Sequence, residues 1–357
     1  MKVGIIGLPQ SGKTTIFNAL TNLQMDVKGY AQKNIESHMG TVKVPDGRVD
    51  YLASVYKPKK ISFVDMTFID IGCKKNDDGR SEFDMTVLRG LDMLAVVVRA
   101  FVSDSVVHPM GDPDPLRDVQ YLKSEFILED LSLVENRMAR LEKDVKRKLK
   151  EAVKEMEYLT AFQKHLEAEQ PLSTYPFDDD AHKLFRGFQF LSQKPIMVAL
   201  NTGEDETDTV DYKSAVDNLA DSDGAYITLC GKLEMEIAQL PDEDKTLFLE
   251  ELNIPEPALD RFIRMSYKLL NRIVFFTVGP DEVKAWEIRK GTCAKDAGGK
   301  IHTDIARGFI RAEVLAYDDF VDCENSYQVA RSRGLVRLEG KQYPVRDGDI
   351  IEFRFNV

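Results

Sequence analysis

The stretch "GLPQSGKT" at residues 7–14 has the spacing G-x-x-x-x-G-K-[ST], carried by Gly7, Gly12, Lys13 and Thr14. Glycines at these positions let backbone N–H groups turn inward around a phosphate, the lysine reaches the outer phosphate oxygens, and the threonine hydroxyl can ligate Mg²⁺. The apolar run "KVGIIGL" leads into the loop, and apolar residues at helical spacing follow it, which predicts a strand, a loop and a helix in that order. The stretch therefore predicts a site for the phosphate chain of a nucleotide.

The chain repeats this apolar pattern at four later points. These runs are "ISFVDMTFIDI", "MLAVVVRAF", "PIMVAL" and "AYITLC". Helix-like segments or long connections separate them, and such alternation is typical of a mostly parallel α/β sheet. Together with the phosphate loop, the alternation predicts the α/β fold of a P-loop NTPase, with a doubly wound sheet.

Composition limits the classes of protein to consider. With 357 residues, the chain is long for one compact core and suggests two or three domains. No apolar run approaches the ~20 residues that span a bilayer. The four cysteines show neither paired metal-ligand spacing nor a disulfide framework, which favours a reducing cytoplasm. The net charge of −12 argues against nucleic acid over the whole surface, although a local basic patch stays open.

Residues 115–190 are rich in Lys and Glu and carry an apolar stripe typical of a long helix. The stripe consists of Leu122, Phe126, Leu133, Met138, Leu141, Val145, Leu149, Val153, Met156 and Leu159. The prolines of "EQPLSTYPFDD" should end this helix, and "AHKLFRGFQFLS" predicts a shorter helix that returns. We expect an antiparallel helical arm, a coiled-coil insertion in the sheet domain. Its basic segment, "KDVKRKLKEAVK" at residues 143–154, is either a solvated helix face or a surface for RNA.

From about residue 275 the pattern changes to short strands with glycine turns, as in "KAWEIRKGT" and "GFIRAEVLAY". The Arg-Asp-Gly near the end and the alternation in "IIEFRFNV" indicate a hairpin. We therefore expect three parts. They are a discontinuous nucleotide-binding domain at residues 1–114 and 191–274, the helical insertion at residues 115–190, and a small β-rich domain at residues 275–357.

Polar residues at the ends of two predicted strands complete the candidate site. Asp70 closes "MTFID" and is the candidate for the Mg²⁺ side, with Asp65 as its competitor and a simple turn cap as the alternative. Asn201 and Glu204 follow "PIMVAL", where a base would be read. Guanine-specific GTPases carry Asn-Lys-x-Asp at such a place, whereas this chain has Asn-Thr-Gly-Glu. We expect guanine recognition to suffer, because buried polar groups left unpaired discriminate strongly.

These motifs together resemble the YchF branch of the Obg-like P-loop proteins, also called Obg-like ATPases. The resemblance rests on the phosphate loop, on Asn201 and Glu204, and on the stretches "VKVPDGRVDYLASVYKPKK", "VVHPMGDPDPLRD" and "AWEIRKGTCAKDAGGKIHTDIARGFIRAEVLAYDDF". It covers essentially the whole chain, with the same order of parts: nucleotide domain, helical insertion and a C-terminal TGS domain, a small β-grasp module. The resemblance implies slow ATP hydrolysis, a preference for ATP over GTP, and a role in translation at the ribosome.

The resemblance also implies roles for particular residues of this chain. The nucleotide would be held by Gly7, Leu8, Pro9, Gln10, Ser11, Gly12, Lys13, Thr14, Thr15, Asn201, Glu204, Cys230 and Gly231. Mg²⁺ would be held by Thr14 and Asp70, and Lys232 follows in the loop that packs on the base. Lys13 and the loop histidine His108 match positions that assist hydrolysis, although a lone histidine in a loop is more often structural.

Two departures from the family pattern fall in the parts that sense or cleave the γ-phosphate. The second switch reads "DIGCKKNDDGRSEF" here, where the family has Asp-Ile-Ala-Gly and a glycine-rich loop. The first-switch threonine that ligates Mg²⁺ falls on Asn34, whose carbonyl oxygen is a less reliable ligand for this cation. No glutamine stands just after Asp70 to orient a water, so turnover should be slow.

Three functions stay open at this point. The first is a slow ATPase that acts as a nucleotide-dependent switch on the ribosome or its RNA, through the arm and the terminal domain. We expect this protein to be a cytoplasmic monomer that binds neither membrane nor DNA. The second is a non-hydrolysing nucleotide-binding interaction module, which Asn34 and "DIGCKK" favour. The third is a conventional GTPase, which rests on the broad superfamily alone.

Overall fold

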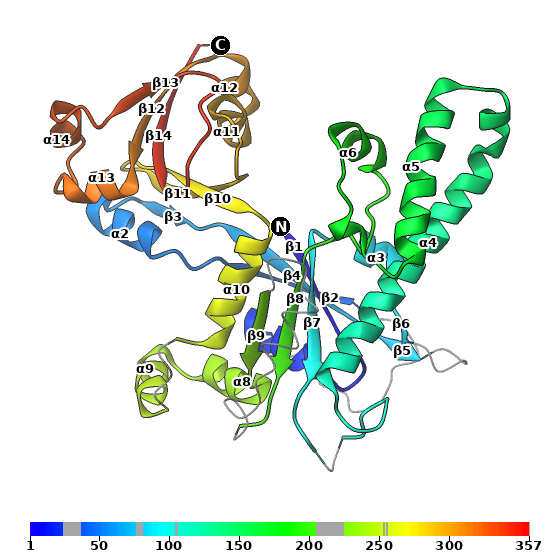
Figure 1. Cartoon of the computed structure of the whole chain (residues 1–357). Helices are drawn as coiled ribbons and strands as arrows, with labels where there is room; N and C mark the ends of the chain where they lie inside the picture. Colours follow the sequence, from blue (N-terminus) through cyan, green and yellow to red (C-terminus); the bar gives the residue numbers. More distant parts are fainter. Residues whose placement is uncertain are drawn as a thin grey trace. The chain divides into compact units, whose positions relative to one another are not determined.

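The structure, a computed structural model, describes residues 1–23, 37–75, 81–103, 106–204, 225–252, 254 and 256–356. None of the helices in these ranges combines the length and the apolar composition that a membrane span needs. The chain forms two compact units. The first comprises Met1–Val42 and Thr67–Phe262, and the second comprises Lys43–Met66 and Ile263–Val357. Figure 1 shows both units, with labels on their helices and strands where there is room.

The first unit is built on a six-stranded sheet in the order β2-β4-β1-β7-β8-β9 (Figure 1). Its strands are β1 (Lys2–Ile6), β2 (Ser37–Lys43), β4 (Asp65–Ile71), β7 (Met93–Arg99), β8 (Ile196–Asn201) and β9 (Ala225–Leu229). The pairs β1–β4, β1–β7, β7–β8 and β8–β9 are parallel. The mostly parallel, doubly wound sheet predicted from the sequence is therefore confirmed. Sheets of this kind bind ligands at the carboxyl ends of their strands, close to where the strand order reverses.

Helices and a short two-stranded sheet lie between these strands in the sequence or follow the last of them. They are α1 (Lys13–Thr21), α3 (Met85–Arg89), α8 (Gly231–Gln239), α9 (Asp242–Glu251) and α10 (Ala258–Leu269), with the strands β5 (Lys74–Lys75) and β6 (Ser81–Glu82). Glu234 of α8 is buried and accepts hydrogen bonds from the N–H groups of Ala258 at 2.9 Å and Leu259 at 3.4 Å. Because the first N–H groups of a helix have no partner within the helix, this carboxylate fixes the start of α10.

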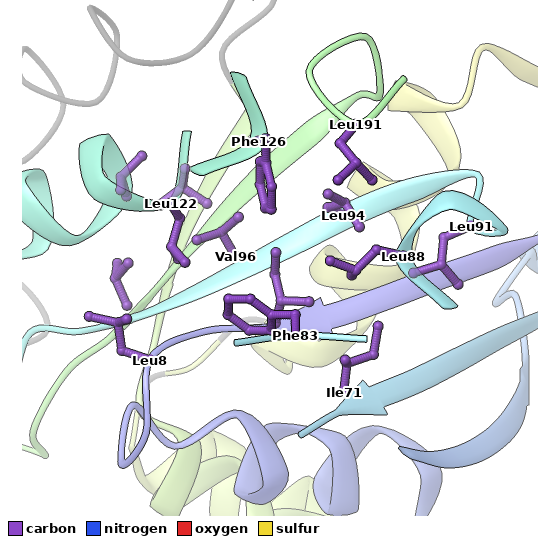
Figure 2. Packing of buried hydrophobic residues seen from close by; sticks show 14 of the residues in the cluster. Leu8, Ile71, Phe83, Leu88, Leu91, Leu94, Val96, Leu122, Phe126 and Leu191 are labelled. Atoms are coloured by element: carbon purple, nitrogen blue, oxygen red, sulfur yellow. The ribbon is translucent and has the colours of Figure 1, made fainter. Parts of the chain in front are cut away.

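Buried apolar side chains pack between the sheet and the helices α3 and α4 (Pro115–Lys146), as Figure 2 shows. Every residue of β7 is buried, which is expected of a central strand covered on both faces. Leu94 and Val96 of this strand share one cluster with Leu88 of α3 and with Leu122 and Phe126 of α4. The N-terminal part of α4 is thereby fixed on the sheet.

The helical arm consists of α4, α5 (Lys150–Glu167), the 3₁₀ turn η1 (Leu172–Thr174) and α6 (Asp179–Phe185). It has an apolar core of its own. The buried members of this core are Ile127, Val134, Leu141, Ala152, Leu159, Phe162, Leu166, Leu172, Ala181, Phe185 and Phe190. Asp114 caps the start of α4 by accepting hydrogen bonds from the N–H groups of Leu116 and Arg117, each at 3.1 Å.

The arm turns back earlier than the sequence predicts. The apolar stripe predicts one helix that continues past Leu159, but α4 ends at Lys146 and α5 begins at Lys150. Lys148 adopts a φ of 60°, in the left-handed region, and the stripe residue Leu149 is 51% exposed. Neither glycine nor proline, the residues that usually mark the end of a helix, stands at this turn. The sequence therefore does not predict the turn.

The second unit contains a mixed sheet in the order β13-β12-β14-β10-β11-β3. Its strands are β3 (Lys60–Ser62), β10 (Arg272–Thr277), β11 (Glu282–Arg289), β12 (Phe309–Ala316), β13 (Arg337–Glu339) and β14 (Asp349–Phe355). Its helices are α2 (Gly47–Tyr56), α11 (Ala294–Ile301), α12 (Thr303–Arg307), α13 (Tyr317–Asp322) and α14 (Tyr327–Ser332). Ala294 and Ala297 of α11 share a buried cluster with Phe275 and Val314 of the sheet. This helix-on-sheet packing forms the core of the predicted β-rich C-terminal domain.

Residues 43–66 group with this C-terminal domain, whereas the sequence boundaries place them in the nucleotide-binding domain. Strand β3 pairs in parallel with β11, with Lys60 opposite Glu282 and Ser62 opposite Lys284. A strand of 3 residues carries too little periodicity to show which sheet it joins. The grouping therefore depends on contacts with residues more than two hundred positions away.

Candidate functional site

The loop from Gly7 to Gly12 joins β1 to α1 at the carboxyl end of β1. A Cβ atom added to Gly7 would lie 2.3 Å from the carbonyl oxygen of Val97. Gly12 caps α1 with a φ of 91°, a left-handed conformation that other residues rarely adopt. Glycine at both positions therefore lets the loop place the N-terminus of α1, with its N–H groups and partial positive charge, where a phosphate would bind.

Thr14 and Asp70 meet beside this loop, as the motif and the strand end predict. The Thr14 hydroxyl donates a hydrogen bond to Asp70 Oδ2 at 2.7 Å. Burial raises the pKa of the Asp70 carboxyl, and the Thr14 hydrogen bond and the charge of Lys13 oppose that rise. The competing Asp65 lies at the opposite, N-terminal end of β4 and is exposed. The strand therefore presents Asp70, and not Asp65, to the phosphate loop.

Two polar oxygens at this place are buried without a hydrogen-bond partner in the part of the chain that the structure describes. They are Asp70 Oδ1 and Ser11 Oγ. Buried polar atoms almost always have a partner, so both oxygens indicate a ligand. A hydroxyl and a carboxylate are the donor types that Mg²⁺ prefers, and the residues present fit this ion.

Most Mg²⁺ ligands would have to come from phosphate and water. Within the described ranges, no group of three or more His, Cys, Asp or Glu side chains could hold a metal ion. Mg²⁺ commonly takes only one or two protein ligands beside the phosphates of a nucleotide. Asn34, the third predicted ligand, lies outside the described residues.

Asn201 connects the phosphate loop to the loop after β9. Its amide Nδ2 donates to the carbonyl oxygen of Ser11 at 2.9 Å, and its Oδ1 accepts from the N–H group of Gly231 at 2.9 Å. The side chain is buried, and a Cβ atom on Gly12 would lie 2.1 Å from Nδ2. In this structure Asn201 therefore holds two loops together, and its amide is directed at main-chain atoms.

The other predicted base-reading residues lie next to Asn201 in the sequence or in space. Glu204 Oε1 forms an ion pair with Lys232 Nζ at 2.7 Å, and the side chains of Glu204 and Lys232 are 51% and 67% exposed. Cys230 is buried and precedes the first residue of α8, Gly231. The sequence offers no signal for the Glu204–Lys232 pair, because the two residues are joined only through the fold.

The remaining predicted loop residues have mixed environments. Leu8 is buried in the apolar cluster between the sheet and the helices α3 and α4. Gln10 adopts a φ of 67°, in the left-handed region. Pro9, Lys13 and Thr15 are half-buried. The loop is thus held to the core by Leu8, while the side chains of Lys13 and Thr15 stay partly accessible to solvent.

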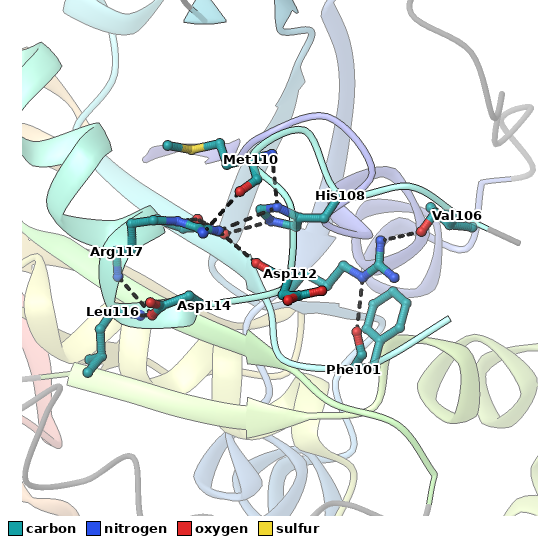
Figure 3. A network of polar contacts seen from close by, with 10 residues as sticks. Phe101, Val106, His108, Met110, Asp112, Asp114, Leu116 and Arg117 are labelled. Atoms are coloured by element: carbon teal, nitrogen blue, oxygen red, sulfur yellow. Dashed lines mark hydrogen bonds and ion pairs between the residues drawn. The ribbon is translucent and has the colours of Figure 1, made fainter. Parts of the chain in front are cut away.

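His108, the predicted catalytic histidine, is buried in a polar network at the start of α4 (Figure 3). Its Nδ1 accepts a hydrogen bond from the N–H group of Met110 at 3.2 Å, so Nε2 carries the proton and donates to Asp118 Oδ2 at 2.9 Å. Arg117 binds the other oxygen of Asp118 at 2.9 Å and the carbonyl oxygen of Met110 at 3.1 Å. In the structure, the hydrogen bonds of His108 hold this loop to the start of α4. A part for His108 in catalysis stays a prediction.

Arg99 lies in the segment that leads to His108, and the sequence motifs do not point to it. It ends β7, is 2% exposed, and donates to the carbonyl oxygens of Phe101 at 3.0 Å and Val106 at 2.9 Å. Its guanidinium lies 4.5 Å from the centre of the Phe101 ring, and burial lowers its pKa. Arg99 therefore shapes the segment that leads to His108. An arginine at the end of six apolar strand residues is the signal that could have revealed it.

Two family models match the chain. The model described as "50S ribosome-binding GTPase" matches residues 2–137, and the YchF GTPase C-terminal model, described as "Protein of unknown function (DUF933)", matches residues 272–356. The "Ribosome-binding ATPase YchF" of Bacillus subtilis (strain 168) is 39% identical over 366 residues, with 100% of both chains covered. The chain belongs to the YchF family.

Further comparisons extend the likeness to YchF over the full length. The "Ribosome-binding ATPase YchF" of Escherichia coli O157:H7 is 37% identical over 362 residues, which cover 100% of this chain and 99% of that one. The structure of the Schizosaccharomyces pombe YchF GTPase matches with a TM-score of 0.84 at 28% identity, and covers 99% of this chain and 97% of that chain. The YchF resemblance predicted from the sequence motifs is therefore confirmed.

Proposed function

We propose that this YchF protein binds ATP with Mg²⁺ in the loop from Gly7 to Thr15, hydrolyses it slowly, and uses the nucleotide state to control its binding to the ribosome. The observation that carries the proposal is the 2.7 Å hydrogen bond between Thr14 and Asp70 at the phosphate loop. Two distant parts of the sequence bring these oxygens together, next to a buried Asp70 oxygen that has no protein partner in the described ranges. The names of the full-length relatives support the same function.

The residues of the site would each hold a different part of the nucleotide. Mg²⁺, when bound, neutralises charge on the phosphates. Thr14 and Asp70 would hold this ion, and Lys13 would place its ammonium against the outer phosphate oxygens. The loop N–H groups and the N-terminus of α1 would bind the inner phosphate. Asn201 holds this loop to Gly231, which supports a fixed spacing between the phosphate and base positions.

The Glu204–Lys232 pair supports ATP over GTP. Guanine presents two neighbouring N–H donors, and a carboxylate with both oxygens available accepts them best. Here the ammonium of Lys232 lies 2.7 Å from Glu204 Oε1, so guanine would have to compete with it. The pairing edge of adenine presents one donor and one acceptor, and a neighbouring carboxylate and ammonium can satisfy both.

GTP hydrolysis is the second candidate function. The names "50S ribosome-binding GTPase" of the matching family model and "YchF GTPase" of the Schizosaccharomyces pombe structure favour it. The same phosphate loop and the same Mg²⁺ residues would serve either nucleotide. The two candidates therefore differ only in the base, and equilibrium binding of ATP and GTP distinguishes them.

Slow turnover is expected from the residues near the phosphate loop. His108 is buried and bonded at both ring nitrogens, so it would have to leave Asp118 before it could act on a nucleotide. No glutamine stands just after Asp70 in the sequence to orient a water. The same features also suit a non-hydrolysing module, and a measurement of hydrolysis has to separate the two.

Single-turnover hydrolysis of ATP in the presence of Mg²⁺ tests the enzymatic part of the proposal. With protein in excess over labelled ATP, we expect phosphate release that Lys13→Ala slows at least about a hundredfold, because the lysine stabilises charge on the transferred phosphate. Lys183→Ala, at an exposed lysine of α6, is the matched control and should leave the rate unchanged. Absence of hydrolysis at saturating ATP would favour the non-hydrolysing module.

The tip of the arm supports a contact with ribosomal RNA. Lys146 and Arg147 are 77% and 74% exposed there. Among the described residues, they pair only with the exposed carboxylates of Glu142 at 3.4 Å and Asp144 at 3.6 Å. Exposed ion pairs of this kind contribute little, so phosphates of RNA could replace the carboxylates at low cost. With such a contact, the protein would act on ribosomes in the cytoplasm. We propose that it does so as a monomer.

A further inference from the structure

Residues Lys43–Met66, named the strap here, leave the sheet of the first unit and return to it. Strand β2 ends at Lys43, and β4 begins at Asp65; the two strands are neighbours in the sheet. The N–H group of Val44 donates to the carbonyl oxygen of Val64 at 2.8 Å, so the two ends of the strap are tied together. The strap is thus an excursion between two adjacent strands, one of which carries Asp70.

Between its ends, the strap is built into the sheet of the C-terminal domain. Strand β3 forms the edge of that sheet and pairs with β11. Ser62 Oγ donates to Glu282 Oε1 at 2.7 Å, and Lys60 Nζ lies 3.2 Å from the same oxygen. The N–H group of Lys60 also donates to the carbonyl oxygen of Asp281 at 3.1 Å. Both main-chain and side-chain contacts therefore fix the position of β3.

Arg48 clamps the strap to the C-terminal domain. Its guanidinium binds Asp46 Oδ2 at 2.8 Å within the strap and Asp347 Oδ2 at 2.8 Å outside it. Asp347 also accepts from the N–H group of Val274 in β10 at 2.8 Å. The guanidinium carbon lies 5.1 Å from the centre of the Phe276 ring, a cation–π distance. A half-buried arginine with two carboxylates and a ring makes a firm connection.

Two tyrosines of α2 add aromatic contacts to this clamp. Tyr56 stacks on Phe320 with ring centres 5.8 Å apart, and Tyr51 meets Tyr317 edge-on at 6.0 Å. The Tyr51 hydroxyl also donates to Asn325 Oδ1 at 3.0 Å. Because these contacts follow one another along α2, the helix is held to the C-terminal domain over its whole length.

We propose that the strap carries the nucleotide state of the phosphate site to the C-terminal domain. The proposal rests on the proposed function, since it needs a nucleotide bound near Asp70. Asp65 and Asp70 lie in one strand, about 17 Å apart at ~3.3 Å per residue. A strand transmits displacement along its axis, so a shift of β4 moves β3 and α2 together with the elements clamped to them. The C-terminal domain then differs between the ATP and ADP states.

The one tryptophan of the chain lies where such a shift can be observed. Trp286 stands in β11, two residues after Lys284, which is opposite Ser62 of the strap. Lys284 Nζ lies 3.8 Å from the centre of the indole ring, and Phe275 stacks on the same ring at 6.4 Å. Indole emission responds to a nearby charge, so displacement of β3 against Lys284 changes the fluorescence of Trp286.

The test compares Trp286 emission of the full chain with ADP and with a non-hydrolysable ATP analogue, both with Mg²⁺. Binding is measured separately by displacement of a fluorescent nucleotide. We expect different emission in the two states for the wild type, and a difference at least about fivefold smaller for Arg48→Met. By linkage, the ratio of the two nucleotide affinities changes in the same variant.

Two further variants control this test. Arg307→Met removes a different Arg–Asp pair of the C-terminal domain, the exposed pair Arg307–Asp304 at 2.8 Å, and should keep the wild-type difference. If Arg48→Met fails to fold, Asp347→Asn removes the ion pair while its amide oxygen still accepts from Val274. Bound nucleotide with equal emission in both states, or a full difference in both strap variants, overturns the inference. Absence of nucleotide binding overturns the proposed function and this inference with it.

Discussion

At the residue scale, Asp70 shows a conflict between function and stability. Burial raises its pKa above the ordinary value of 3.8, against the Thr14 hydrogen bond and the charge of Lys13. An acid with a raised folded-state pKa contributes stability that is fully present below its unfolded pKa and is lost as the pH rises through the folded pKa. At neutral pH the ionised carboxylate therefore lowers the stability of the protein without Mg²⁺. Under the proposed function, the site keeps this charge because the cation requires it.

The first prediction concerns Asp70→Asn. At pH 7, without nucleotide or Mg²⁺, we expect the free energy of unfolding to rise by about 1 kcal/mol. The gain should shrink as the pH is lowered through the raised pKa toward 3.8. Urea denaturation at several pH values measures it. The same variant should lose the Mg²⁺ dependence of nucleotide binding.

Asp65→Asn is the matched control, because this aspartate is exposed at the other end of the same strand. It should change neither the stability nor the Mg²⁺ dependence. A variant at Asp70 that unfolds more easily at pH 7, or that binds nucleotide with undiminished Mg²⁺ dependence, would contradict the assigned role.

Residues of the candidate site were predictable from the sequence where a motif fixes the local backbone. The spacing of Gly7, Gly12, Lys13 and Thr14 predicts a loop and a helix start, and the structure contains both. The partner of Asn201 was not predictable, because its amide binds the main chain of Ser11 across 190 positions. The partners of Arg99 were not predictable, because they are carbonyl oxygens, although its place at the end of an apolar strand marks it as unusual.

At the element scale, the helical arm shows what periodicity can and cannot predict. The apolar stripe predicts the helices and their buried face, and Leu122, Phe126 and Leu159 are all buried. The turn after Lys146 was not predictable, because a left-handed lysine at position 148 makes it. The arm therefore has its tip at the basic segment, and not at the later prolines.

The second prediction concerns this tip. Reversing three charges, Lys146→Glu, Arg147→Glu and Lys150→Glu, should weaken co-sedimentation with ribosomes at least about tenfold at low salt. Each lost phosphate contact also removes released counterions, so the remaining binding should depend less steeply on salt. Sedimentation at several salt concentrations measures both effects.

A matched triple variant controls for the general effect of added negative charge. Lys164→Glu, Lys183→Glu and Arg186→Glu reverse three exposed residues of the same arm outside the tip. This variant should retain most of the ribosome binding. Equal binding by the wild type and the tip variant would remove the tip from the interface.

At the scale of the whole molecule, the order of parts was predictable and one connection was not. Strand, helix and hairpin patterns predict a sheet domain, a helical arm and a β-rich terminus, and the fold contains all three. The sequence pattern places the strap, Lys43–Met66, in the sheet domain, but it groups with the C-terminal domain. Its grouping depends on long-range pairs such as Arg48–Asp347, which become visible only in three dimensions.

The strap connects the C-terminal domain to the chain at a second place. The C-terminal domain is joined to the chain at its own start near residue 263 and again through residues 43–66. The second connection continues directly into the strand that carries Asp70. Under our proposal, a domain with this second chain connection can respond to the nucleotide, whereas a domain joined by one linker would not have to.

Equilibrium binding of ATP, ADP, GTP and GDP in the presence of Mg²⁺ tests the central claim most directly. Calorimetry on the full chain and on Lys13→Ala gives all the affinities needed. We predict ATP to bind at least about tenfold more tightly than GTP, a difference of ~1.4 kcal/mol, and Lys13→Ala to weaken ATP at least as much. GTP that binds tenfold more tightly than ATP, or ATP that binds equally well to Lys13→Ala, would contradict the account.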